Sequence, residues 1–184
     1  MNYVLLCEKP IAIMIEIRPA TPEDASIIQQ LAEAIWLPTY SPILSQEQIR
    51  YMLDHIYDLD SITGQIKNGN QTYMMLMVDG VPTGFAAYSA RTENPDIYKL
   101  HKLYCLTETK GQGYGRLLLR DVEKRVTQTG ITVLELNVNK YNPARGFYEK
   151  MGYEVAYSEE IPIGPYIMDD YVMRKEFPPI ANRQ

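Results

Sequence analysis

The sequence predicts a mixed α/β fold in one domain, and three observations support this prediction. Apolar runs of strand length alternate with segments whose apolar residues repeat at helical spacing. The chain has 184 residues, 46% of them hydrophobic and 22% charged, which suits one compact core. Neither an internal repeat nor an interdomain linker is visible. We therefore expect one domain over residues 14–177, preceded by an extension over residues 1–13 and followed by a tail over residues 178–184.

The first half of the chain predicts a strand, three helices and a β-hairpin. Thr21 is followed by proline and two acids, which is typical of a helix start. Prolines disfavour a continuing helix, so the segment between Pro38 and Pro42 is predicted to be a loop. Asp79-Gly80 lies between two apolar runs and predicts a hairpin turn. The expected elements are a strand from Ile15, helices from Thr21, from Ser45 to about Tyr57 and around Ser61–Lys67, and a hairpin over Tyr73–Ser89.

The second half predicts strands that alternate with two helices and end in an antiparallel pair. Gly130 and Gly152 each follow a segment of helical periodicity, as glycines that end helices do. The expected elements are strands over Lys99–Leu106 and Ile131–Val138, helices over Gly115–Thr129 and Ala144–Met151, and a closing pair over Tyr153–Ser158 and Tyr166–Phe177.

A glycine-rich turn, Lys110-Gly-Gln-Gly-Tyr-Gly115, joins a predicted strand to a predicted helix. Alternate glycines leave main-chain N–H groups uncovered, and a helix start adds its positive dipole end, so this turn favours a phosphate. A plain tight turn is the alternative. No Gly-Lys-Ser/Thr follows, which excludes a nucleotide-hydrolysing loop. The preceding hairpin argues against a dinucleotide-binding fold.

Composition narrows the class of protein further. The net charge of −5 and the pI near 5.1 argue against a nucleic-acid partner. Two cysteines, Cys7 and Cys105, and two histidines give no metal-site spacing and no disulfide framework. No apolar run is long enough for a membrane span, and the N-terminal segment does not resemble a signal peptide. We expect a cytoplasmic protein without a metal.

Two segments carry a family resemblance. Lys99–Leu119, which contains the glycine-rich turn, resembles the acetyl-CoA signature of the GNAT N-acetyltransferase superfamily, and Leu136–Tyr153 resembles its second signature. The resemblance covers about residues 14–177. It implies acetyl-CoA as cosubstrate. It also implies a mixed, mostly antiparallel central sheet flanked by helices and splayed between its fourth and fifth strands, where the pantetheine arm enters.

The resemblance also assigns candidate site residues. Asn142 follows the fifth strand as a cofactor contact, and Tyr148 would lie beside the cofactor sulfur and protonate the departing thiolate. Two positions depart from the family signatures. Lys110 replaces the usual glutamine or arginine. The spacing from Asn142 to Ala144 is one residue shorter than in many relatives, so Asn139 or Tyr141 is a further candidate for the role of Asn142. The remaining cofactor-binding candidates are Leu103, Tyr104 and Cys105 along the strand, and Lys110, Gly111, Gln112, Gly113, Tyr114, Gly115 and Arg116 around the pyrophosphate.

Other residues have two interpretations each. His101 is either a base for the amine or an ordinary strand residue, and Cys105 is a nucleophile only if a histidine partner exists. Tyr40 and Tyr88 either pack in the core or line the acceptor site. Asp169-Asp170 forms either a turn or a pair of carboxylates that attracts a polyammonium ligand.

The expected activity is acetyl transfer from acetyl-CoA to a primary amine by direct attack in a ternary complex. Trp36–Ser41, Tyr51–Asp54 and the late segment Asp170–Lys175 resemble the PaiA-type polyamine acetyltransferases within the family, which suggests a small polyamine such as spermidine. Two alternatives are acetylation of a protein N-terminus or lysine, and a non-catalytic acetyl-CoA-binding sensor module. A homodimer remains open.

Overall fold

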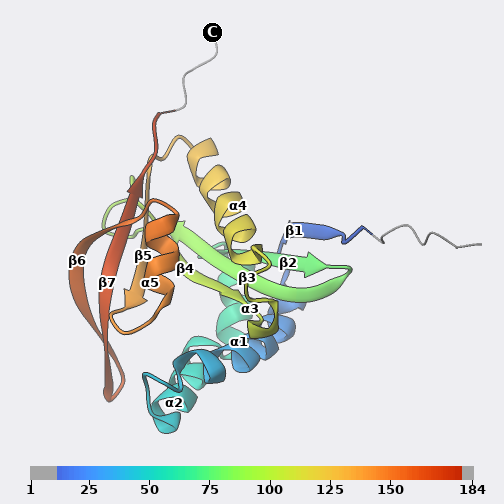
Figure 1. Cartoon of the computed structure of the whole chain (residues 1–184), viewed down its shortest axis with the longest axis vertical. Coiled ribbons are helices and arrows are strands. Elements are labelled where there is room, and N and C mark those ends of the chain that lie inside the picture. The colour runs from blue at the N-terminus through green and yellow to red at the C-terminus, as the bar shows by residue number, and fades with distance from the viewer. Residues whose placement is uncertain (1–11, 180–184) are drawn as a thin grey trace, which may run out of the picture.

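The computed structural model describes residues 12–179, and its seven strands form one sheet (Figure 1). The predicted extension over residues 1–13 and the predicted tail over residues 178–184 therefore lie mostly outside the described residues. The strand order across the sheet is β1-β2-β3-β4-β5-β7-β6. The strands are β1 (Ile15–Pro19), β2 (Thr72–Val78), β3 (Val81–Ala90), β4 (Tyr98–Cys105), β5 (Val133–Asn139), β6 (Glu154–Ile163) and β7 (Tyr166–Glu176).

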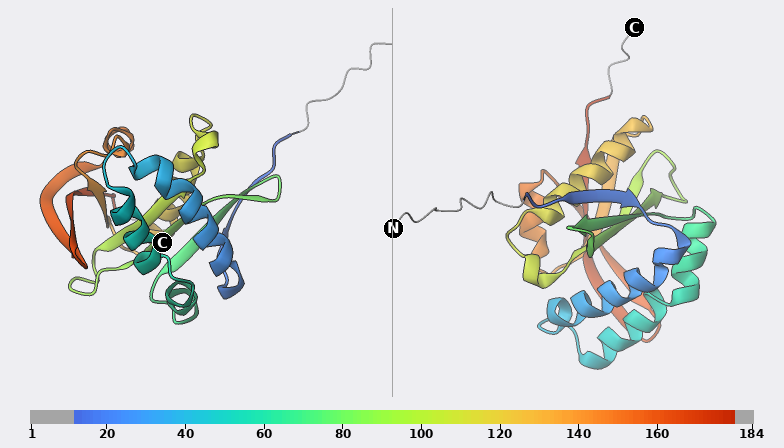
Figure 2. Two further views of the ribbon diagram at one scale, coloured as in Figure 1. Left: turned by 90° about the horizontal axis from the view of Figure 1, so that it is seen from below. Right: turned by 90° about the vertical axis from the view of Figure 1, so that its right-hand side faces the viewer.

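Helices cover both faces of this sheet, as Figure 2 shows from two directions. One apolar cluster packs under α1, α2 and α3, and a second packs under α4 and α5. The helices are α1 (Ala25–Tyr40), α2 (Gln46–Ile56), α3 (Leu59–Lys67), α4 (Tyr114–Gln128) and α5 (Ala144–Lys150), with short 3₁₀ helices η1 (Pro22–Asp24) and η2 (Thr107–Thr109).

The sheet is splayed at its centre, between the fourth and fifth strands. Every neighbouring pair is antiparallel except β4 and β5, which run parallel. These two strands pair only where Tyr98–Leu100 meets Leu134–Leu136, and they diverge beyond that point. The predicted fold class, including the splay, is confirmed.

Local signals located most elements correctly. Asp79 and Gly80, at φ 50° and 78°, form the tight turn between β2 and β3 that an Asp-Gly pair favours. Ser45 accepts a hydrogen bond from the N–H of Gln48 at 3.1 Å and so begins α2. The apolar stripe of α1 is buried as its spacing predicts, at Ile28, Leu31, Ala32 and Ile35.

The predicted loop around Pro38 is wrong, because α1 continues through it to Tyr40. Proline removes only its own N–H donor, and the N–H of Ser41 closes the last turn by bonding the carbonyl of Leu37 at 3.0 Å. Tyr40 packs on Trp36 with ring centroids 4.6 Å apart and is almost completely buried. Burial of a tyrosine outweighs one lost hydrogen bond near a helix end.

Two further boundaries differ from the prediction. β6 extends to Ile163, five residues beyond the predicted end at Ser158, because it pairs with β7 up to the hairpin tip. Asp169 and Asp170 lie inside β7 and not in a turn. The strand predicted over Tyr166–Phe177 already contains both aspartates, and the pairing of β7 with β5 and β6 excludes the alternative of a turn.

Candidate active site

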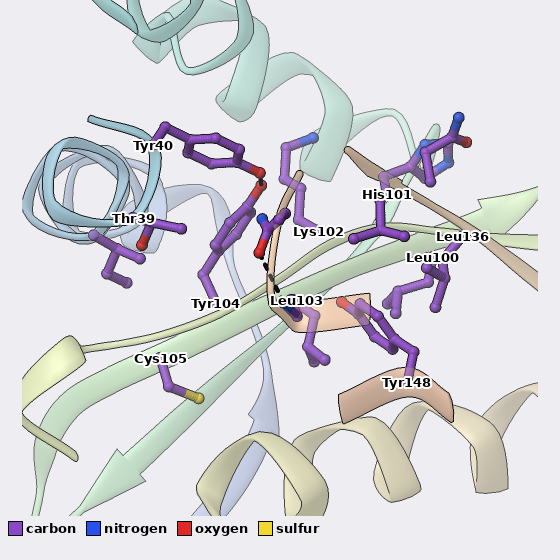
Figure 3. A pocket seen from close by; sticks show the side chains of 15 residues that line it. Thr39, Tyr40, Leu100, His101, Lys102, Leu103, Tyr104, Cys105, Leu136 and Tyr148 are labelled. Carbon is purple, nitrogen blue, oxygen red and sulfur yellow. Dashed lines mark hydrogen bonds between the residues drawn. The ribbon is translucent and has the colours of Figure 1, made fainter. Parts of the chain in front are cut away.

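A cleft of about 200 Å³ lies where β4 and β5 separate (Figure 3). Its lining comes from β4, β5, the start of α5 and the C-terminal half of α1. The sequence-predicted residues that line it are Leu103, Tyr104, Cys105, Asn142 and Tyr148, together with Tyr40 and His101.

The side of β4 that faces β5 is open for binding. From His101 to Cys105 β4 has no partner on β5 among the described residues, although it remains paired with β3. Main-chain groups on such an edge can bind an extended ligand as a neighbouring strand would. This geometry fits the amide-containing arm of coenzyme A.

The glycine-rich turn adopts backbone conformations that glycine favours. Gly111 has φ 89° and Gly113 has φ 82°, and Gly113 is the residue that precedes α4. Side chains at such angles are strained. A Cβ atom at either position would meet nothing within 4 Å, so the space beside the turn is unfilled by described residues.

Main-chain donors of the turn divide into bonded and free groups. The N–H of Lys110 bonds the carbonyl of Thr107, and the N–H of Gln112 bonds the carbonyl of Thr109, each at 3.1 Å. Lys110 and Gln112 can therefore contribute to an anion site only through their side chains. The N–H groups without a main-chain partner among residues 12–179 are those of Gly111, Gly113, Tyr114, Gly115 and Arg116. Five free donors at a helix start fit a pyrophosphate.

Tyr148 points from α5 into the cleft (Figure 3). Its ring packs on Phe147 and Tyr153 at centroid distances of 5.2 and 5.9 Å, which fixes its direction. Burial raises the pKa of Tyr148 well above its ordinary value, so the phenol stays protonated at neutral pH. A buried, protonated hydroxyl that faces a cleft is suited to donate a proton.

Asn142 has a structural contact as well as a place in the cleft. Its Oδ1 accepts a hydrogen bond from the N–H of Ala144 at 2.9 Å, which begins α5. Its amide nitrogen is a donor that also lies close to the Tyr40 hydroxyl, whose pKa it lowers. Tyr141 is 76% exposed and does not line the cleft, while Asn139 uses its Oδ1 to accept the N–H of Tyr141 at 3.1 Å.

Of the two tyrosines considered for the acceptor site, only Tyr40 lines the cleft. Tyr40 reaches the cleft and lies 3.3 Å from Tyr104, hydroxyl to hydroxyl. Tyr88 does not line the cleft: it is buried on the α4 side of the sheet, beside Tyr98 at a centroid distance of 6.2 Å. Along β3, Ala86 and Tyr88 share the α4 side of the sheet while Phe85 and Ala87 share the opposite side, so strand alternation decides where Tyr88 points.

His101 and Cys105 are poorly suited to the reactive roles considered for them. Burial lowers the pKa of His101 to about 3, and its Nε2 lies 2.8 Å from the hydroxyl of Ser89. A group with this pKa is a weak base at neutral pH. Burial raises the pKa of the Cys105 thiol to about 12, so it remains a neutral thiol.

Lys102 is a buried residue that the sequence analysis missed. It lines the cleft, is 6% exposed, and donates to the Oε1 of Gln71 at 3.1 Å. Its ammonium also lies over the rings of Tyr57 and Tyr73 at 5.8 and 5.2 Å, and it has no carboxylate partner among the described residues. Burial lowers the pKa of Lys102 to about 8. A lysine within an apolar strand gives no sequence signal of this environment.

Replacing Lys102 with methionine is expected to stabilise the fold at neutral pH. The folded pKa of about 8 lies below the ordinary 10.5, so the charged form weakens folding below pH 8 and this penalty disappears as the pH rises toward 10.5. The shift corresponds to about 3 kcal/mol at most, and the cation–π contacts reduce it.

Thermal unfolding measured from neutral to alkaline pH checks this expectation. Wild type should gain stability with pH, whereas Lys102→Met should start higher and show less of this rise. Lys124→Met, on the exposed face of α4, is the matched control and should behave as wild type. A Lys102→Met variant less stable than wild type at neutral pH contradicts the expectation.

A row of polar side chains on the sheet face near the cleft contains Asn139, which the sequence analysis named as an alternative to Asn142, and Asn137, which it missed. Asn137 and Asn139 alternate with Leu136 and Val138 along β5. Strand alternation places the two asparagines on one face, in the middle of the sheet. This pattern was a usable signal, since polar residues in a central strand need a structural or functional reason.

Two other features are absent from residues 12–179. No group of three or more His, Cys, Asp or Glu side chains that could hold a metal ion occurs there. None of the helices in this range is long and apolar enough to cross a membrane.

Comparison with known proteins decides the family. A family model described as an acetyltransferase (GNAT) domain matches residues 40–163, which are 124 of the 184 residues. The chain belongs to the GNAT acetyltransferases. Its cosubstrate is therefore acetyl-CoA.

Individual GNAT relatives resemble the chain along nearly their whole length. A spermidine N(1)-acetyltransferase from Thermoplasma acidophilum is 24% identical over 168 residues, covering 89% of this chain and 98% of the relative. The crystal structure of PaiA N-acetyltransferase from the same organism, in complex with coenzyme A, matches with a TM-score of 0.77 at 25% identity, covering 89% of this chain and 99% of that one.

More distant GNAT structures share the fold alone. A GCN5-related N-acetyltransferase from Rhodopseudomonas palustris has a TM-score of 0.76 at 22% identity, covering 92% of this chain and 100% of that one. The ribosomal-protein-S18-alanine N-acetyltransferase of Escherichia coli has a TM-score of 0.64 at 16% identity, covering 93% and 99%.

Proposed function

We propose that this GNAT enzyme transfers an acetyl group to a primary amine of a small polyamine such as spermidine, by direct attack in a ternary complex. The observation that carries this proposal is the end-to-end similarity to the spermidine N(1)-acetyltransferase of Thermoplasma acidophilum, over 168 residues.

The cosubstrate supplies an activated acetyl thioester and a thiolate leaving group. The free N–H groups from Gly111 to Arg116 would hold its pyrophosphate, and the open edge of β4 from Leu103 to Cys105 would bind its pantetheine arm. Asn142 offers an amide donor near the bend between β5 and α5. Tyr148 would give its proton to the departing sulfur.

Contacts between α2 and the β6–β7 hairpin favour a slender acceptor over a protein surface. Tyr51 of α2 packs against Tyr166 with ring centroids 5.3 Å apart. A side chain at Gly164 would overlap the Tyr51 phenol, so the hairpin tip lies directly on the helix. Gln48 of α2 also contacts the sulfur of Met168 at 3.9 Å. These contacts bridge the two halves of the splayed sheet on the α1 side and narrow that approach to the cleft.

An amine panel tests the proposal. Purified protein is incubated with acetyl-CoA and spermidine, spermine, 1,3-diaminopropane, lysine, or peptides with free N-termini, and acetylated products are detected by intact mass. We expect spermidine or spermine to be acetylated at least about tenfold faster than the peptides, a difference of about 1.4 kcal/mol in transition-state binding.

The other outcomes identify the alternatives. Faster acetylation of peptides would show a protein N-terminal or lysine acetyltransferase. Acetyl-CoA binding without acetylation of any amine in the panel would favour a sensor module. Either result contradicts the proposed polyamine activity.

A further inference from the structure

Three polar side chains meet on the face of the sheet that α1 and α2 cover. Asn139 of β5 and Glu159 of β6 are the two register partners of Asp170 on β7, so all three residues lie on one face. Asn137 shares this face two residues earlier on β5, and its Nδ2 donates to Glu159 at 2.9 Å. Asn137 also lines the cleft between β4 and β5.

Two acceptor atoms in this group lack a donor. Asp170 is 6% exposed, and its buried Oδ1 has no hydrogen-bond partner among the described residues. The buried Oδ1 of Asn137 also has none within residues 12–179. Buried acceptors are nearly always paired, so two unpaired acceptors beside the active-site cleft indicate a ligand that brings N–H donors.

The groups around Asp170 shift its pKa in both directions and leave the carboxyl mostly ionised at neutral pH. Burial raises its pKa to about 6, Asn139 and Lys99 of β4 lower it, and Asp169 and Glu159 raise it again. Tyr40 of α1 faces it from the helical layer. No ion pair to Asp170 occurs among the described residues. With a pKa of about 6, it is mostly a carboxylate at neutral pH.

We propose that Asp170 and Asn137 form the binding site for the reacting amino group of the acceptor, and that Asp170 accepts a proton from it. The ligand class is a primary aliphatic ammonium, whose three N–H groups match the two unpaired oxygens with one N–H to spare. This inference rests on the proposed amine acetylation and names the group that recognises the amine.

The proton balance is complete without another reactant. An aliphatic ammonium has a pKa near 10.4 in water, and it gives one proton to the Asp170 carboxylate and then to solvent. The neutral nitrogen forms a bond to the thioester carbonyl carbon, and the carbon–sulfur bond breaks with its electron pair on sulfur. Sulfur takes a proton from Tyr148, and the second proton lost from nitrogen restores the phenol. The net products are the acetamide, the thiol and one proton.

The test compares Asp170→Asn with Asp169→Asn. Asparagine keeps the size of Asp170 and removes its charge. Asp169 is the adjacent residue on the opposite face, is partly exposed, and forms an ion pair with Lys140, which makes it a matched control. Asp170→Ser serves as a second variant, and circular dichroism verifies that each variant is folded.

Two measurements are made on each protein. The first is kcat/KM for spermidine from about pH 5 to about pH 9, which reports the pKa of the base in the free enzyme. The second is binding of n-propylamine to the enzyme–coenzyme A complex, detected by saturation-transfer NMR. Propylamine has only the amino group in common with polyamines, so it probes the amino-group site by itself.

We expect Asp170→Asn to lower kcat/KM by about 100-fold, because general-base catalysis contributes at least this factor. The acid-side rise of kcat/KM near pH 6 should disappear, and propylamine should bind about tenfold more weakly, as expected for a lost charge-assisted hydrogen bond. Asp169→Asn should stay within about twofold of wild type, as exposed ion pairs contribute little.

Unchanged propylamine affinity, or an unchanged acid-side rise, in folded Asp170→Asn overturns the inference. Failure of the proposed polyamine activity gives a different set of results from failure of this inference. In that case wild type does not acetylate spermidine, while propylamine binding still depends on Asp170.

Discussion

Replacing Tyr148 with phenylalanine is expected to lower kcat by about 100-fold or more while leaving coenzyme A affinity unchanged, because only the proton donor is removed. The ring keeps its packing on Phe147 and Tyr153. No hydrogen bond to the Tyr148 hydroxyl occurs within the described residues, so its loss should affect stability little. Single-turnover kinetics with the best amine of the panel measure the chemical step directly.

The matched control is Tyr141→Phe, since Tyr141 is 76% exposed and lies outside the cleft. This variant should retain wild-type turnover. Burial raises the pKa of Tyr148, so its phenol stays protonated and no ionisation of this residue should limit the rate near neutral pH. A Tyr148→Phe enzyme with wild-type turnover would remove the proton-donor role from the proposed mechanism.

A glutamate in place of Gly113 is expected to abolish acetyl-CoA binding. The substitution places a carboxylate at the start of α4, where the free N–H groups lie. This carboxylate would repel the pyrophosphate of the cosubstrate and compete with it for the same donors. Loss of two charge-assisted hydrogen bonds, at about 1.5–3 kcal/mol each, corresponds to at least about a 100-fold weaker affinity. Isothermal titration calorimetry with coenzyme A gives this affinity.

Gly130→Glu provides the control for backbone strain. Gly130 has φ 90° and an unobstructed Cβ position, as Gly113 does, but it follows the opposite end of α4. Both variants should lose about 1–2 kcal/mol of folding stability from the left-handed conformation. Only Gly113→Glu should lose coenzyme A binding. Equal affinities for the two variants would place the pyrophosphate elsewhere.

Patterns within short stretches of sequence predicted most of the fold. The Asp79-Gly80 turn, the Ser45 helix start and the periodicity of α1 and α4 depend on residues a few positions apart. Gly111 and Gly113 in the turn before α4 also have a local cause, since their positive φ angles strain any side chain. The cleft position of Tyr148 was predicted as well, through a motif that spans β5 and α5.

Other features depended on contacts that no local pattern contains. Pro38 remains helical because Tyr40 gains a buried position against Trp36. Tyr88 points away from the cleft because the face of β3 that it shares with Ala86 packs on the α4 side of the sheet. Lys102 is buried beside the rings of Tyr57, which follows α2, and Tyr73 of β2, and both residues are far from it in sequence.

The sequence alone therefore determined the order of elements, the glycine turn and the family, since these follow from backbone preferences and a contiguous motif. The tertiary structure alone decided which polar groups become buried without partners. The raised pKa of Asp170 comes mainly from burial, with Asp169 and Glu159 adding to it, and it arises only where β5, β6 and β7 pair side by side. Desolvation depends on all the atoms around a group, and these come from segments up to a hundred or more residues apart.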